Sequence, residues 1–283
     1  MAGFDRHPAR LWRKHMNSNP FIRNFFTDSS NRTQDDRNHI IYFRERSFNM
    51  LKRDLILRNP LRVIEHETED ILPEGGFGAI LSRAGVGKTA FLVQLALNNM
   101  LRNKNVLHIS LNEPVHKVGL WYEETLRNIA LLYNIKQMDQ LWEAILPHRF
   151  IMTFKVEVFS VATLQERLSD LTEQNIFCPR MMLIDRLPVD ETTREALTEL
   201  KALAKRQGIH IWFTVKTHRH EDVTEAGFPI PFSHVADLFE VAIGLQPDGS
   251  RIHVNVLKGK SGDDSRDAQC FLDPATMLIK DAV

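Results

Sequence analysis

Short apolar runs and longer amphipathic stretches alternate along most of the chain after residue 70. Apolar runs of about four to eight residues fit buried strands, and apolar residues spaced three and four apart are typical of helices packed on a sheet. The expected strands are Gly78–Ser82, Val106–Leu111, Phe150–Phe154, Met181–Asp185 and His210–Val215. The expected helices are Lys88–Leu101, Val115–Leu132, Gln137–Leu146, Val161–Gln174 and Glu191–Gln207. This alternation predicts an α/β fold with a mainly parallel central sheet flanked by helices.

The pattern changes at both ends of the sequence. After Leu238 the segments alternate over shorter distances and are separated by turn residues, which predicts C-terminal β-hairpin strands at Phe239–Leu245, Arg251–Leu257, Gln269–Leu272 and Met277–Ile279. Before residue 63 a polar stretch, residues 17–37, precedes an amphipathic helical pattern at residues 38–58. We therefore expect an N-terminal helical and irregular appendage, residues 1–62, and an α/β domain, residues 63–283.

One junction between a strand and a helix carries the most specific motif. An apolar run leads into a glycine-containing turn that ends Gly87-Lys88-Thr89, and an amphipathic helical pattern follows. Such a turn directs backbone N–H groups and the positive end of a helix dipole at one point, where phosphates bind. Lys88 would contact the β- and γ-phosphates, and the Thr89 hydroxyl would bind Mg²⁺. The expected nucleotide-binding residues are Ser82, Arg83, Ala84, Gly85, Val86, Gly87, Lys88, Thr89 and Ala90.

The first position of this loop departs from the usual motif, because Ser82 stands where glycine is common. A small residue is kept there, so the turn remains compatible with a phosphate loop. The alternative interpretation is a turn that binds nothing. The strand before the loop and the helix after it favour the phosphate-binding interpretation.

Two carboxylates follow other expected strands. Asp185 ends the run Met181–Asp185, at the carboxyl end of a strand, where open parallel sheets bind ligands, and it is the candidate second magnesium ligand. Glu113 follows the strand Val106–Leu111 and is the candidate that polarises water for attack on the γ-phosphate. The alternatives are a turn or helix-cap role for Asp185, and for Glu113 an acid stabilised by a helix dipole.

Charge is unevenly distributed along a chain whose net charge is zero. Residues 1–62 contain thirteen Lys and Arg against six Asp and Glu, so they carry +7 and residues 63–283 carry −7. A basic segment of this kind contacts either nucleic acid or an acidic protein surface, its own domain or a neighbouring subunit included. No apolar run approaches the ~20 residues of a membrane span, so we expect no membrane association and a cytoplasmic location.

The order of these motifs resembles the RecA-fold P-loop ATPases of the RecA, DnaB-helicase and KaiC-like group. The resemblance covers roughly residues 70–283 and rests on the Gly87-Lys88-Thr89 loop, Ser110-Leu111-Asn112-Glu113-Pro114, Leu183-Ile184-Asp185, and Leu200–Lys205 leading to Ile211–Val215. It implies a RecA-like core, ATP and Mg²⁺ as ligands, and a homo-oligomeric ring or filament.

The resemblance also implies roles for residues late in the sheet. Thr217 or His218 would be the sensor of the γ-phosphate, and Lys258 and Lys260 would contact the nucleotide of a neighbouring subunit. The second member of that pair is commonly arginine in the group, so Lys260 is a departure that removes a bidentate fork. From the residues alone, a solvated turn is the favoured interpretation of this lysine pair.

The expected function is Mg-ATP binding with hydrolysis, coupled to oligomer assembly or to remodelling of a partner; Lys88 and Glu113 are the candidate catalytic residues. The first alternative is a weakly hydrolysing, ATP-gated regulatory or scaffold protein, which the single acid of Asn112-Glu113 leaves open. A DNA-dependent recombinase or helicase-like motor is the second alternative. The weakly basic stretch at residues 219–232 argues against it.

Overall fold

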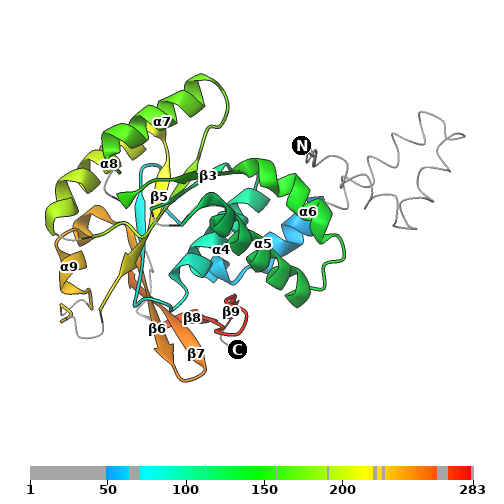
Figure 1. Ribbon diagram of the computed structural model, residues 1–283. Helices are drawn as coiled ribbons and strands as arrows, with labels where there is room; N and C mark the ends of the chain where they lie inside the picture. Colours follow the sequence, from blue (N-terminus) through cyan, green and yellow to red (C-terminus); the bar gives the residue numbers. More distant parts are fainter. Residues whose placement is uncertain are drawn as a thin grey trace, which may run out of the picture. The chain divides into compact units, whose positions relative to one another are not determined.

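A computed structural model describes residues 49–63, 71–111, 113–156, 159–189, 191–218, 222–224, 227–259 and 267–281 (Figure 1). The chain divides into two compact units, Met1–Leu51 and Lys52–Val283. Most of the expected basic appendage, residues 1–48, lies outside the described residues. The second unit contains the sheet and the helices that cover it.

The second unit begins before the boundary expected at residue 63. Residues 52–57 are helical and are followed by a short 3-10 helix, η1 (Pro60–Val63). Leu55 and Leu61 are buried, and the Lys52 ammonium donates to the Asn103 side chain at 2.8 Å. The end of the expected amphipathic helix therefore packs on the α/β domain.

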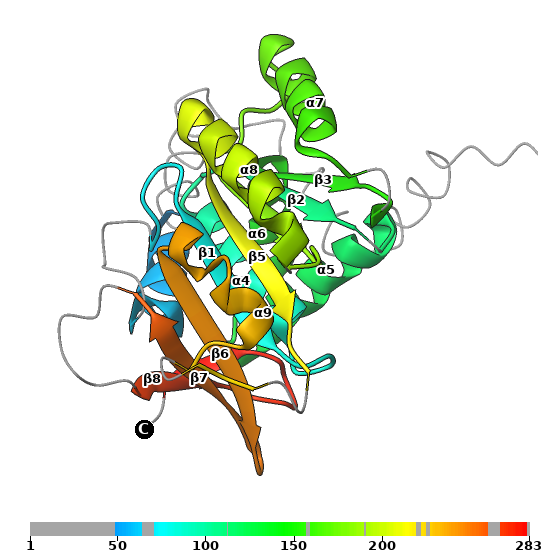
Figure 2. The same ribbon diagram turned by 90° about the vertical axis from the view of Figure 1, so that its left-hand side faces the viewer.

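A nine-stranded sheet forms the centre of the described part of the chain. Its strands pair in parallel from β3 to β6, whereas β6 to β9 pair antiparallel and extend from one edge (Figure 2). Their order across the sheet is β3 (Arg149–Thr153), β2 (Val106–Ser110), β4 (Met181–Asp185), β5 (His210–Lys216), β1 (Phe77–Ser82), β6 (Val241–Asp248), β7 (Arg251–Lys258), β8 (Asp267–Leu272) and β9 (Ile279–Asp281).

Helices cover both faces of the parallel strands, as the apolar runs predict. Every residue of β1, β2 and β4 is buried. In Figure 1, α7 and α8 lie on one side of the sheet, and α4, α5 and α6 lie on the other. The helices are α4 (Lys88–Leu101), α5 (Val115–Leu132), α6 (Met138–Ile145), α7 (Val161–Glu173), α8 (Arg194–Gln207) and the short α9 (Ile230–Ser233). Within the described ranges, no helix is both long enough and apolar enough to span a bilayer.

Alternate residues along the strands build the core beneath α7 and α8. Phe77 and Phe213 lie on neighbouring parallel strands, with ring centroids 4.9 Å apart. Phe239, just before β6, packs on both rings. Leu164 and Leu200 close the cluster from the helices above. This core fixes β1 between β5 and β6, the position from which the loop after β1 emerges.

Each expected element after residue 70 overlaps an element of the structure, and most differ from it by one to three residues at an end. α4 and α5 begin and end at the predicted residues. The prediction of a strand at Met277–Ile279 is wrong in position, because β9 starts only at Ile279. Residues 273–277 form a tight turn instead, in which the Met277 N–H donates to the Asp273 carbonyl at 2.7 Å and Met277 has a φ of 54°.

Replacing Gly78 by alanine tests the close contact between β1 and β5. A Cβ at Gly78 would lie 2.6 Å from the ring of Trp212, which is 2% exposed. We expect Gly78→Ala to lower the free energy of unfolding by about 1–3 kcal/mol, because an overpacked core must shift. Urea denaturation measures the change.

The matched control is Gly119→Ala, in the middle of α5, where an added Cβ meets no atom within 4 Å. There the same substitution should raise stability by up to about 1 kcal/mol, since alanine favours a helix over glycine. Equal shifts for the two variants would contradict the packing argument.

Candidate functional site

The loop between β1 and α4 depends on glycine at two positions. Gly85 and Gly87 have φ values of 80° and 112°, in the left-handed region that side chains with a Cβ avoid. A Cβ on Gly87 would also lie 2.5 Å from Leu272 of β8. Gly87 is the N-cap of α4 and provides no side-chain cap, and the opening N–H groups of a helix have no acceptor within it. The loop therefore presents backbone donors at the positive end of α4.

The Lys88 side chain folds back on this loop. Its ammonium donates to the carbonyl oxygens of Ser82 and Arg83, at 2.7 and 2.8 Å, and to the Ser82 hydroxyl at 3.3 Å. Burial lowers the pKa of Lys88 to about 8, with the nearby charges of Arg186 and Lys216 acting in the same direction, while Asp185 opposes the shift. The loop thus holds a cation whose described hydrogen bonds are all made with Ser82 and Arg83.

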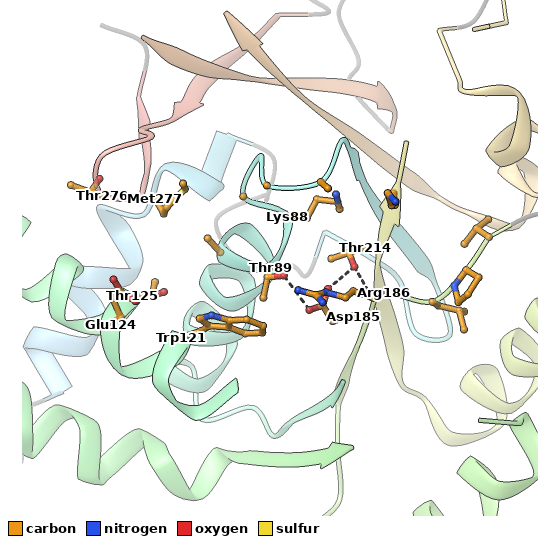
Figure 3. A pocket seen from close by; sticks show the side chains of 18 of the residues that line it. Lys88, Thr89, Trp121, Glu124, Thr125, Asp185, Arg186, Thr214, Thr276 and Met277 are labelled. Atoms are coloured by element: carbon orange, nitrogen blue, oxygen red, sulfur yellow. Dashed lines mark hydrogen bonds between the residues drawn. The ribbon is translucent and has the colours of Figure 1, made fainter. Parts of the chain in front are cut away.

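Asp185 lies at the carboxyl end of β4, where three elements meet. Its carboxylate accepts hydrogen bonds from the hydroxyls of Thr89 on α4, at 3.1 Å, and Thr214 on β5, at 2.6 Å (Figure 3). The side chain is almost fully buried. Burial raises the pKa of Asp185, and this effect exceeds the opposing effect of the two hydrogen bonds. The predicted pair of magnesium ligands, Thr89 and Asp185, is therefore in direct contact.

Glu113 is held by two cations near the end of β2. Its carboxylate forms ion pairs with Lys117, at 2.8 Å, and with Arg186, at 3.0 Å. Its backbone N–H donates to the Ser110 hydroxyl at 3.0 Å. The hydrogen bond from Lys117 and, after it, the charge of Arg186 lower the pKa of Glu113, so this residue is an anion at neutral pH. Its neighbour Asn112 lies outside the described residues.

A pocket of about 990 Å³ opens over the loop and extends in two directions. On one side it runs between α5 and the turn from β8 to β9, and on the other it runs along the segments that follow β4 and β5 (Figure 3). The first side is lined by Trp121, Glu124, Thr125, Asn128, Ala275, Thr276 and Met277. The second is lined by Arg186, Leu187, Pro188, Val189, Lys216, His218 and Pro231.

The turn from β8 to β9 is fastened to the helices beside the loop. The Gln94 amide of α4 donates to the Met277 carbonyl at 2.9 Å and accepts from the Ile279 N–H at 2.8 Å. Asn128 of α5 donates to the Thr276 carbonyl at 3.1 Å. One wall of the pocket is therefore fixed by the same helix that begins with Lys88.

The structure brings most of the predicted site residues together. Ala84, Gly85, Gly87, Lys88, Thr89, Ala90, Asp185 and His218 line the pocket. Ser82 and Arg83 contribute through their contacts with Lys88, and Val86 is buried beneath the loop. These residues come from the loop after β1 and from the ends of β4 and β5, the shared edge expected of a parallel sheet.

Other predicted site residues lie away from the pocket lining. Glu113 is not among the lining residues, and its described contact with the lining is the ion pair with Arg186. The Thr217 N–H donates to the Ser82 carbonyl at 3.0 Å, a backbone contact that joins the end of β5 to the start of the loop. Lys258, at the end of β7, donates to the Ala236 carbonyl at 2.8 Å, and Lys260 lies outside the described residues. Within one chain, Lys258 is therefore not part of this pocket.

Sequence reasoning missed three residues that the fold brings to the site. Thr214 is a polar residue near the end of the buried strand β5, which pairs with β4. Knowledge of this pairing would have identified Thr214 as a neighbour of Asp185. Arg186 directly follows Asp185, and only its contacts single it out. Trp121 lies within an amphipathic helix and has no distinguishing spacing.

Comparison of the sequence with models of known protein families and with curated proteins gave no match.

Competitive acylation tests the pKa of Lys88. With a pKa of about 8, about half of the Lys88 side chain is the reactive neutral amine at pH 8. An ordinary lysine amine at that pH is only about 0.3% neutral. We expect labelling of Lys88, mapped by mass spectrometry, to rise with a midpoint near pH 8, against a lysine amide standard in the same reaction. A midpoint near that of the standard would contradict the assignment.

Proposed function

We propose that this chain is a Mg-ATP-binding P-loop ATPase with a RecA-like core. The observation that carries the proposal is the contact between Thr89, directly after Lys88 in a glycine-dependent loop, and Asp185 at the end of a neighbouring strand. This contact joins an anion-binding loop to a buried carboxylate at the shared edge of a parallel sheet, where ligands of such sheets bind. The mainly parallel sheet with antiparallel C-terminal strands supports the same proposal.

The loop residues have the donors that a triphosphate requires. Backbone N–H groups at the start of α4 would hold the phosphate oxygens, and Lys88 would exchange the carbonyls of Ser82 and Arg83 for the β- and γ-phosphates. Lys216 and Arg186 add positive charge to the same pocket. Because phosphate oxygens accept charge-assisted hydrogen bonds better than carbonyls do, the exchange favours binding.

Thr89 and Asp185 fit a magnesium ion. Mg²⁺ is usually bound by one or two carboxylates together with substrate phosphates and water, so one hydroxyl and one carboxylate suffice. Among the described residues no cluster of three or more His, Cys, Asp or Glu side chains suggests a metal site of another type. When bound, the ion would neutralise charge on the β- and γ-phosphates. Asp185 and Thr89 would fix its position beside Lys88.

Hydrolysis would use Glu113 to orient the attacking water, and a homo-oligomer would supply Lys258 and Lys260 from a neighbouring subunit. Within one chain, Lys258 is bonded to the Ala236 carbonyl. A contribution across subunits would make the rate per subunit rise with protein concentration.

Because ATP is an intracellular metabolite, the cytoplasmic location expected from the sequence belongs to this proposal.

A second candidate function is an ATP-held switch that turns over slowly. The ion pairs of Glu113 with Lys117 and Arg186 favour it, because they occupy the carboxylate that would orient water. The two functions share one binding site and differ only in the rate of hydrolysis. Measurement of ATP binding and of turnover in the same preparation separates them.

Calorimetric titration with Mg-ATP, followed by turnover measured over a range of protein concentrations, tests the proposal. We expect Lys88→Ala to lower the affinity for ATP about 10- to 100-fold, since a charge-assisted hydrogen bond contributes about 1.5–3 kcal/mol. The matched control is Lys136→Ala, at an exposed position away from the pocket. Equal affinities for Lys88→Ala and the control would refute the phosphate-binding role.

We also expect Trp121 to provide the stacking surface for the base. It lies on α5 and lines the pocket, and in Figure 3 its ring is drawn between Glu124 and Arg186. Stacking of a base on an aromatic ring contributes about 1–3 kcal/mol, so Trp121→Ala should weaken ATP binding about 5- to 100-fold. Affinity for inorganic triphosphate should stay unchanged. Parallel losses for ATP and triphosphate would place the base elsewhere.

A further inference from the structure

Arg186 has an unusual backbone position directly after Asp185. Its φ is 70°, in the left-handed region that non-glycine residues seldom adopt. Its N–H donates at 2.8 Å to the Thr214 hydroxyl, which itself donates to Asp185. Such a conformation persists where the surroundings fix it, and it is common at functional sites. Here the Thr214 hydroxyl fixes both Asp185 and the residue that follows it.

The Arg186 guanidinium lies in the pocket together with Lys88 and Asp185. The side chain is 44% exposed and its contact with Glu113, at 3.0 Å, is on the side of α5. The two cations line one pocket, and Thr89, the residue after Lys88, donates to Asp185, the residue directly before Arg186. A ligand that contacts Lys88 with its terminal phosphates is therefore within the electrostatic range of Arg186.

Glu113 and Arg186 form a pair that a phosphate can break. An ion pair with a partly exposed member contributes little to stability, because water screens it. Glu113 keeps a second cation, Lys117 at 2.8 Å, when Arg186 leaves. A γ-phosphate accepts two parallel hydrogen bonds from a guanidinium and carries more charge than a carboxylate. The exchange therefore leaves neither carboxylate nor guanidinium without a partner.

We propose that Arg186 is a γ-phosphate ligand supplied by the same subunit, which Glu113 holds in the nucleotide-free protein and releases when a nucleoside triphosphate binds. This inference rests on the proposed function. On binding, Arg186 moves from the Glu113 carboxylate to the γ-phosphate. Glu113 keeps its contact with Lys117 and gains a free carboxylate oxygen for the attacking water. The state of this ion pair thus reports whether the bound nucleotide carries a third phosphate.

The exchange predicts opposite effects for the two members of the pair. Without Arg186 the γ-phosphate loses a ligand, so the preference for triphosphate over diphosphate falls. Without the Glu113 charge Arg186 loses its ion-pair partner, so that preference rises. A purely structural ion pair would move both variants in the same direction, through stability alone.

The test is calorimetric titration of the full chain with Mg-ADP and with a non-hydrolysable Mg-ATP analogue. For Arg186→Gln we expect the affinity ratio of triphosphate analogue to diphosphate to fall about tenfold, with ADP affinity changed less than twofold. For Glu113→Gln we expect the ratio to rise about threefold.

Two variants serve as matched controls. Arg180→Gln removes an arginine of an exposed ion pair, 2.7 Å from Glu74 and outside the pocket lining, and should leave the ratio unchanged. Glu124→Gln removes a carboxylate that lines the pocket but has no described contact with Arg186. Its loss should raise the affinities for both nucleotides by similar factors.

The outcomes separate this inference from the proposed function. Wild-type protein that binds neither nucleotide would overturn both. Wild-type protein that binds the triphosphate, with an Arg186→Gln ratio equal to that of the wild type, would overturn the inference alone. If Arg186→Gln does not fold, Glu113→Gln decides: a raised ratio supports the exchange, and an unchanged or lowered ratio overturns it.

Discussion

Burial of one carboxylate at the end of β4 organises the site. Asp185 is 1% exposed, and the hydroxyls of Thr89 and Thr214 donate to it in place of the water it has lost, with the nearby charges of Arg186 and Lys88 acting in the same direction. A buried carboxylate of this kind is costly unless donors surround it, so α4, β4 and β5 are held at one relative position by the same group. The Thr214 hydroxyl also accepts from the backbone of Arg186, which extends this constraint into the pocket wall. The loop, the buried carboxylate and the adjacent cation are therefore positioned together.

The C-terminal antiparallel strands belong to the site as well as to the sheet. Leu272 of β8 packs where Gly87 has no side chain, and Gln94 of α4 bonds both sides of the turn before β9. Because the Gln94 amide satisfies two backbone groups, displacement of the turn would leave buried polar atoms without partners. The position of the loop after β1 and the folding of the last strands are thus coupled.

In the described structure two cations of the pocket already have partners. Lys88 donates to carbonyls of its own loop, and Arg186 is paired with Glu113. Binding of a polyanion would therefore replace internal contacts by stronger ones, and would not create charge contacts where none existed. This arrangement limits the cost of holding several cations near one another in the pocket. It also gives the residues around the pocket two alternative sets of partners, which is what a nucleotide-dependent change requires.

The sequence by itself determined the elements and the local motif. Gly85, Gly87 and Lys88 are recognisable because backbone geometry and phosphate chemistry act over a few neighbouring residues, and the apolar runs that predict β1, β2 and β4 are buried as expected. Only the tertiary structure decided what reaches the pocket from far along the chain. Thr214 meets Asp185 because β5 lies between β4 and β1, an order that periodicity does not contain. The same holds for the contact of Glu113 with Arg186 and for the shift of β9, since long-range contacts depend on strand order and on the packing of side chains from separate elements.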